Sequence, residues 1–149
     1  MKSINIFSVK QVKDKGGLYD LESKNICSPK DAQNIIQTVL DLNSEAVEKF
    51  GILTLNTKNV VAGIHIISTG TLDAAIVHPR SVFQAAILNN AASIILFHNH
   101  PSGDPSPSPE DVRMTERLVS AGELMGISVL DHIIVGDGRF TSLKEMGLM

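Results

Sequence analysis

Two histidines one residue apart stand at the end of an apolar run, and an aspartate follows eleven residues after the second. They are His98, His100 and Asp111, within the stretch ILFHNHPSGDPSPSPED at positions 95–111. In an extended strand, residues i and i+2 point to the same side, so both imidazoles can reach one ion. Zinc accepts imidazole and carboxylate ligands, and three protein ligands leave a fourth position for water, as in hydrolytic sites. The pattern therefore predicts a catalytic zinc site.

A structural explanation without a metal is also open for the aspartate. Ser108, Pro109 and Asp111 have the spacing of a capping box, with proline at the first helical position and the acid at the third. Four prolines stiffen the preceding loop, because each ring fixes one backbone dihedral; they are Pro101, Pro105, Pro107 and Pro109. A helix that begins here would favour these residues for its own stability. On spacing alone, the metal site and the plain helix start remain alternatives.

A site of this kind needs a rigid strand before His98 and a helix that begins near Ser108. Residues 91–97 are a continuous apolar run with β-branched members, typical of a strand buried on both faces. Residues 108–126 have the apolar spacing of an amphipathic helix that stops at Gly126. The other expected elements are a strand at 3–12, a helix at 28–42, a hairpin at 49–67, an extended stretch at 69–79, a helix at 79–90, and a strand, turn and return strand at 127–143. This order predicts an α/β fold, a two- or three-layer sandwich with a mixed β-sheet flanked by helices.

Composition places the chain among ordinary folded domains. It has 149 residues, 43% hydrophobic and 19% charged, and a net charge of −3. No basic stripe stands out, so direct nucleic-acid binding is doubtful. The single cysteine, Cys27, excludes an intrachain disulfide and is expected to be a small apolar filler, which fits a reducing, cytoplasmic location. No signal peptide and no membrane-spanning run is apparent.

The stretch HNHPSGDPSPSPED resembles the JAMM metalloprotease signature, in which His-x-His is followed by seven residues, the first of them proline here, and then by Ser-x-x-Asp. Together with LDHIIVGDGRFTSLKEMG at 130–147, it is similar to the RadC family of that superfamily, from about Glu48 to the C-terminus. The resemblance implies a cytidine-deaminase-like JAB/MPN architecture in one domain. Residues 1–42 would be an N-terminal strand, loop and helix packed on a metal-binding core at 43–149.

The resemblance also implies roles for individual residues. His98, His100 and Asp111 would bind Zn²⁺, with water in the fourth position. Glu48 fits the family's Glu-x-Phe pattern as the general base, and Glu45 is the competing choice. The hydroxyl of Ser108 would donate to the developing oxyanion. The implied reaction is cleavage of an amide or isopeptide bond in an unknown peptide or protein substrate.

Several neighbouring residues are expected to be structural first. Gly103 would permit a tight turn, Asn99 would tie down a loop, and Asp104 would cap one. The pair Asp131 and His132 is expected to be a satisfied structural pair, with a second role in holding a ligand left open. His65 and His78 are assigned surface or structural roles.

The sequence departs from the RadC pattern in ways that affect its expected partners. The helix-hairpin-helix segment common in the family is missing from these residues, and Ser81 and His65 stand where acidic residues are usual. A non-catalytic module associated with DNA repair is therefore the alternative to a hydrolase. A metal-dependent nuclease is weaker, because no second carboxylate cluster is apparent. The size of the chain leaves room for a homodimer formed through an edge strand or the N-terminal strand.

Overall fold

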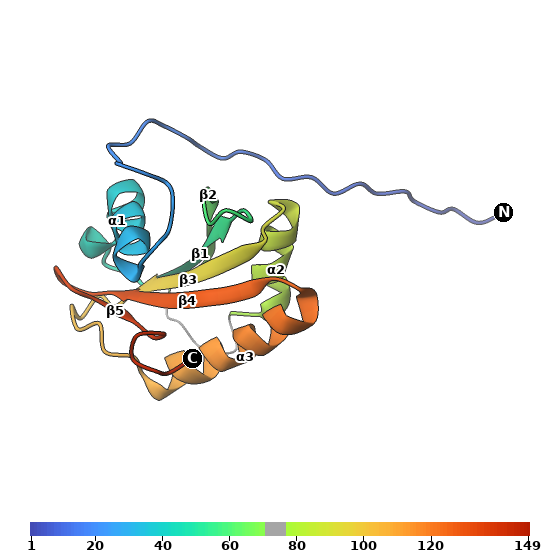
Figure 1. Ribbon diagram of the computed structural model, residues 1–149. Coiled ribbons are helices and arrows are strands. Elements are labelled where there is room, and N and C mark those ends of the chain that lie inside the picture. Colours follow the sequence, from blue (N-terminus) through green and yellow to red (C-terminus); the bar gives the residue numbers. More distant parts are fainter. Residues whose placement is uncertain (71–76) are drawn as a thin grey trace.

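The computed structural model describes residues 1–70 and 77–149, and in them five strands form one mixed sheet (Figure 1). The strand order across the sheet is β2-β1-β3-β4-β5. β3 and β4 run parallel, and the other neighbours are antiparallel. The strands are β1 (Lys49–Leu55), β2 (Val61–Thr69), β3 (Ser93–Asn99), β4 (Ser128–Val135) and β5 (Phe140–Ser142). The predicted mixed sheet, the hairpin and the return strand are confirmed.

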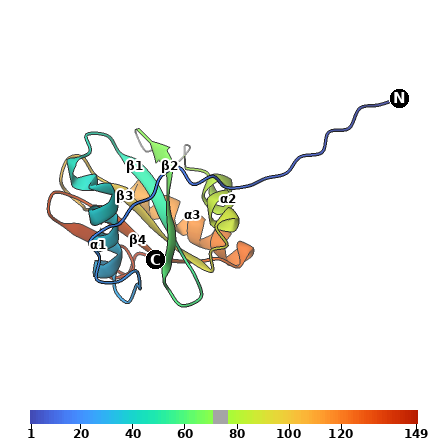
Figure 2. The ribbon, with the colours of Figure 1, turned by 90° about the horizontal axis from the view of Figure 1, so that it is seen from above.

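Helices cover both faces of the sheet, which makes a three-layer α+β sandwich (Figure 2). α1 (Pro29–Leu40) packs on one face through Ala32, Ile35 and Ile36. α2 (Pro79–Leu88) and α3 (Pro109–Met125) pack on the other face. A short 3-10 helix, η1 (Leu42–Ser44), follows α1. The three predicted helices are therefore confirmed, and the strands between the layers are buried from two sides.

α1 and α3 begin with the same device. Ser28 accepts from the backbone N–H of Asp31, and Ser108 accepts from that of Asp111, while each aspartate accepts from the backbone of its serine. Both are capping boxes, which satisfy two of the free N–H groups at a helix start. α3 ends at Gly126, whose φ of 71° lies in the left-handed region that glycine adopts without strain. The structural explanation of Ser108 and Asp111 is thus correct, and it does not exclude a second role.

β3 lies at the centre of the sheet, and all seven of its residues are buried. Its register pairs His98 with Phe50 of β1 and with Ile134 of β4. Phe50 belongs to the core on the side of α2 and α3, so His98 faces that layer. Asn99 is the next residue and faces the opposite way. At the end of β3, His98 therefore points toward the layer of α2 and α3, and Asn99 points toward the layer of α1.

The predicted strand at 3–12 is wrong. Residues 1–20 form neither helix nor strand, and their N-terminal part extends away from the body of the molecule (Figure 1). The side chains of Ile4, Ile6 and Phe7 are exposed. β-Propensity needs a partner strand to become a β-strand, and the structure pairs none with this segment. The extended stretch expected at 69–79 falls mainly on residues outside the described part of the chain.

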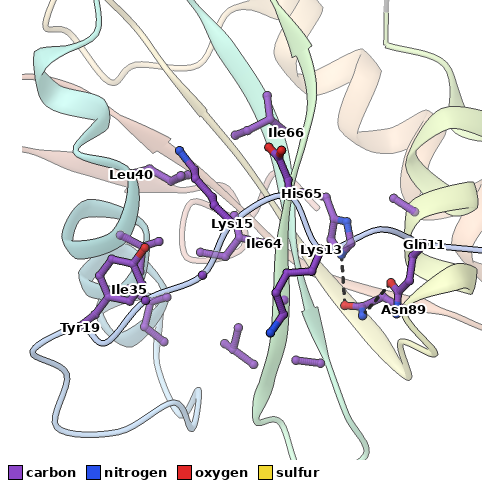
Figure 3. Close-up of a pocket in the computed structure, with 18 of the residues that line it drawn as sticks. Gln11, Lys13, Lys15, Tyr19, Ile35, Leu40, Ile64, His65, Ile66 and Asn89 are labelled. Carbon is purple, nitrogen blue, oxygen red and sulfur yellow. Dashed lines mark hydrogen bonds between the residues drawn. The ribbon is translucent and has the colours of Figure 1, made fainter.

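The expectation for Cys27 is also wrong, because its side chain is exposed just before α1 rather than packed in the core. His65, in contrast, is structural as expected. Its Nε2 lies 3.1 Å from Oδ1 of Asn89, whose amide nitrogen donates to Oε1 of Gln11 (Figure 3). In the described residues no helix combines the length and hydropathy that a membrane span requires.

A groove of about 860 Å³ separates the N-terminal segment from the sheet edge. Residues 11–17 cross the groove, with α1 on one side and β2 beneath them (Figure 3). Ile35 of α1 and Ile64 of β2 contribute apolar walls. None of the three predicted metal ligands lines this groove.

Candidate metal centre

His98, His100 and Asp111 converge as the sequence predicted. Nε2 of His98 lies 2.9 Å from Nε2 of His100. The two oxygens of Asp111 lie 3.3 Å and 3.2 Å from these nitrogens, respectively. One donor atom from each residue lies within 4.8 Å of the others. β3 supplies the first histidine, the residue after its end supplies the second, and the first turn of α3 supplies the carboxylate.

The donor set fits a zinc ion. Two ligands of a tetrahedral zinc, each about 2.1 Å from the ion, lie roughly 3.4 Å apart. The separations of 3.3 Å and 3.2 Å between Asp111 and the two imidazoles are close to this value. Both histidines offer the same ring atom, Nε2, toward the shared centre. Side-chain exposures of 1%, 16% and 10% for His98, His100 and Asp111 place the centre beneath the surface but within reach of solvent. Three ligands with solvent access on one side are typical of a catalytic rather than a structural zinc site.

The other ring nitrogen of His100 is held by the proline-rich loop. Nδ1 of His100 lies 2.8 Å from the backbone carbonyl oxygen of Asp104, which can only accept, so the proton is on Nδ1 and Nε2 is left to bind. The turn that brings this carbonyl round has Gly103 at φ 89°. The carboxylate of Asp104 accepts from the backbone and hydroxyl of Ser106. Gly103 and Asp104 therefore have the structural roles expected, and Asp104 also orients a ligand through its backbone.

His98 is held by two further side chains behind it. Its Nδ1 lies 2.7 Å from Nε2 of His132 on β4. Nδ1 of His132 lies 2.6 Å from the hydroxyl of Thr115 on α3. Thr115 and His132 are both fully buried. Thr115 was not predicted, although its position one turn after Asp111, between the buried Met114 and Leu118, was a usable signal.

The side chains of Asp131 and His132 lie on opposite sides of β4, although the carboxylate of Asp131 accepts from the backbone N–H of His132 at 2.7 Å. Asp131 accepts from the hydroxyl of Ser142 and from the backbone of Lys144, so it holds β5 and the C-terminal turn. The ring of His132 faces the other side and contacts His98. Asp131 is therefore a satisfied structural residue as expected, and His132 has the role that was left open, since it holds a candidate ligand.

The electrostatics favour an ionised carboxylate at Asp111. Burial alone would raise the pKa of Asp111, but its interactions with the side chains of His100 and His98 outweigh this effect and hold the pKa well below the usual range. The hydrogen bond to Asp111 raises the pKa of His100, and the charge of Glu48 adds to this effect. Burial lowers the pKa of His132 well below its usual value, so this ring is neutral.

The two candidate bases, Glu45 and Glu48, have different surroundings. Glu45 forms an ion pair of 2.8 Å with the Nζ of Lys49 near the surface. Glu48 lies just before β1, and its charge acts on His100. Asn99, between the two histidines, accepts from the backbone N–H of Lys49 at 2.7 Å and donates to the carbonyl of Val47 at 3.0 Å. The amide of Asn99 therefore fixes the backbone on both sides of Glu48, which makes its loop-holding role more specific than expected.

Comparison with known proteins agrees with this geometry. The RadC-like JAB domain family matches residues 26–148. A UPF0758 protein of Methanosarcina acetivorans is 51% identical over 126 residues, which is 85% of this chain and 54% of that protein. A UPF0758 protein of Caldanaerobacter subterraneus subsp. tengcongensis is 53% identical over 126 residues, 85% of this chain and 53% of its own length. One from Moorella thermoacetica is 59% identical over 102 residues, 68% and 44% of the two chains. The chain thus spans about half the length of the curated relatives it matches.

Proposed function

Because the chain belongs to the RadC-like JAB domain family, we propose that it is a zinc-dependent hydrolase of the JAMM type that cleaves an amide bond. The observation that carries the proposal is the convergence of His98, His100 and Asp111. Each of these side chains has a second polar atom engaged elsewhere, by His132, by the carbonyl of Asp104 and by the backbone of Ser108. Nε2 of each histidine and Oδ1 of Asp111 are left to face one common point.

The residues around this point have complementary roles in the proposed reaction. A zinc ion bound there would lower the pKa of its water toward ~7 and polarise the scissile carbonyl. Glu48 would accept a proton from the attacking water and deliver it to the leaving amine. Ser108 accepts from the N–H of Asp111 at 3.1 Å, which leaves its own hydroxyl proton to be donated to the developing oxyanion.

The substrate class follows from this chemistry rather than from a recognised binding surface. A general base that returns its proton to an amine suits peptide and isopeptide bonds. We propose a peptide or protein substrate, a cytoplasmic location and no direct nucleic-acid binding, the last on the net charge of −3. Because the matched region is only about half of each relative, selection of the substrate by the rest of such proteins is part of the proposal.

Metal binding is tested first, with a control that the fold itself supplies. Asp111→Asn removes the charged ligand, whereas Asp31→Asn makes the same change in the capping box of α1, for which no histidine is near enough to form a metal group among the described residues. We expect one equivalent of zinc in the parent and in Asp31→Asn by elemental analysis, and none in Asp111→Asn. Equal zinc contents in both variants would contradict the proposed site.

Catalysis is tested with Glu48→Gln, which keeps the size of the side chain and removes its basicity. We expect zinc to stay bound and turnover of peptides and of lysine-linked isopeptides to fall by roughly 10²–10⁴-fold. Turnover at the parent's rate would exclude Glu48 as the base. A parent that binds zinc but cleaves none of these substrates would favour a non-catalytic module.

A further inference from the structure

Four groups form a hydrogen-bonded chain that begins at the backbone of α3 and ends at the candidate metal centre. The hydroxyl of Thr115 lies 2.7 Å from the carbonyl oxygen of Asp111 and 2.6 Å from Nδ1 of His132. Nε2 of His132 lies 2.7 Å from Nδ1 of His98. Nε2 of His98 then faces His100 and Asp111. The side chains of Thr115 and His132, which lie behind His98 in this series of hydrogen bonds, are fully buried.

The direction of the first bond fixes the direction of the others. A carbonyl oxygen can only accept, and a threonine hydroxyl has one proton, so Thr115 gives that proton to Asp111. Toward His132 the hydroxyl oxygen can then only accept, which places the ring proton of His132 on Nδ1. In the described part of the chain, the His132 ring bonds to His98 and Thr115 and to no acidic side chain. A fully buried ring of this kind is neutral, so Nε2 of His132 is bare and accepts from Nδ1 of His98. The same bond leaves the lone pair of His98 on Nε2, at the centre.

We propose that Thr115 and His132 are positioning residues that hold His98 in the one tautomer able to bind a divalent cation through Nε2. The inference rests on the proposed metal site. Reversing every proton in the chain would place a proton on Nε2 of His98 and block the ligand atom. Thr115 prevents this reversal because its proton is committed to the carbonyl of Asp111.

Both ligand histidines therefore carry their proton on Nδ1, but different groups accept it. His100 donates directly to a backbone carbonyl, whereas His98 donates to a second imidazole that is itself oriented from α3. Asp111 takes part twice, since its side chain faces the centre and its carbonyl anchors the chain. The affinity for the cation should consequently depend on a threonine that does not face the centre.

Thr115→Val tests this dependence, and Thr115→Ser is the matched control. Valine has nearly the same shape but cannot accept from His132, so the Nδ1 proton would be buried without a partner and the reversed chain would be favoured. Serine keeps the hydroxyl. For protein stripped of metal and titrated with zinc against a chromophoric chelator, we expect about 10- to 100-fold weaker binding in Thr115→Val. In Thr115→Ser we expect binding within about threefold of the parent. Equal affinities in the valine variant and the parent would overturn the proposal.

Nitrogen-15 NMR of the histidine rings gives a second readout, which tests the proposal on the parent alone. At neutral pH and without metal, we expect the proton of His132 on Nδ1 in the parent. In Thr115→Val we expect it on Nε2. A parent ring protonated on Nε2 would overturn the proposal, even if the valine variant failed to fold. A parent that binds no zinc but shows His132 protonated on Nδ1 would refute the proposed function and leave the proton order intact.

Discussion

Asn99 offers a sharp test of how the candidate base is held, because one buried amide makes both bonds to its flanking backbone. Asn99→Ala removes the acceptor for Lys49 N–H and the donor to the carbonyl of Val47. Asn99 is 2% exposed, but Val47 is 47% exposed, so water can replace part of what is lost. Each lost bond should then cost roughly 1–1.5 kcal/mol, near the lower part of the range for a buried group left unpaired.

The expected total is a loss of about 2–3 kcal/mol in the free energy of unfolding. For a chain of this length, the loss corresponds to a fall of roughly 4–12 °C in Tm. Urea unfolding of the metal-free protein measures it, with Asn34→Ala on the exposed side of α1 as the control, expected within about 0.5 kcal/mol of the parent. Zinc affinity should change little, because Asn99 faces away from the histidines. A loss no larger than that of the control would refute the reasoning that this amide fixes the segment around Glu48.

Three further predictions use the same geometry. Ser28→Ala and Ser108→Ala each remove the cap of a capping box and should each lower the free energy of unfolding by about 1 kcal/mol. Only Ser108→Ala should also slow hydrolysis. Equal turnover in the two variants would exclude an oxyanion role for Ser108. A Cβ at Gly136 would collide with the carbonyl oxygen of Gly103 and lie 2.8 Å from Cδ of Pro105, so Gly136→Ala should displace the loop that orients His100. We expect this variant to be less stable by roughly 1–3 kcal/mol and to bind zinc more weakly in a titration. The control Gly16→Ala should change neither stability nor zinc binding. In metal-free protein, the lowered pKa of Asp111 gives stability that is present above the ordinary value of 3.8 and is lost as pH falls through the folded pKa. The raised pKa of His100 gives stability that is present below the ordinary value of 6.5 and is lost as pH rises through the folded pKa. Their joint contribution should be complete between those two values, and urea unfolding at pH 5.5 and 8.5 should show a difference that shrinks in Asp111→Asn.

The ligand set could be predicted because strand alternation and a helix start are local properties of the sequence. His98 and His100 follow a buried apolar run, and Asp111 occupies the third position of a helix with a clear cap. Spacing could not show that Asp111 also lies beside two histidines. Asp31 stands in the same capping box on α1, and the difference between the two is the pair of histidines brought to Asp111 by the sheet.

The residues behind the ligands were harder to predict for the same reason. Thr115 and His132 are 17 residues apart and meet only because α3 packs against β4. The N-terminal segment fails in the opposite way: its composition suits a strand, but a strand also needs a neighbour, and neighbours are a property of the whole fold. Contacts between distant elements are therefore where sequence patterns gave least information in this chain.

Because side chains alternate along β3, the candidate metal centre depends on the register of this strand as well as on the types of its residues. Shifting this strand by one position against β1 would turn the amide of Asn99 toward α3 and the imidazole of His98 toward the other layer. The candidate ligands and the two hydrogen bonds from Asn99 to the backbone of Val47 and Lys49 would be lost together. An insertion of one residue should be tolerated in the turn at 89–92, where its effect can be absorbed before the strand begins. The same insertion between residues 93 and 100 should abolish metal uptake, and relatives of any length are expected to keep this interval constant.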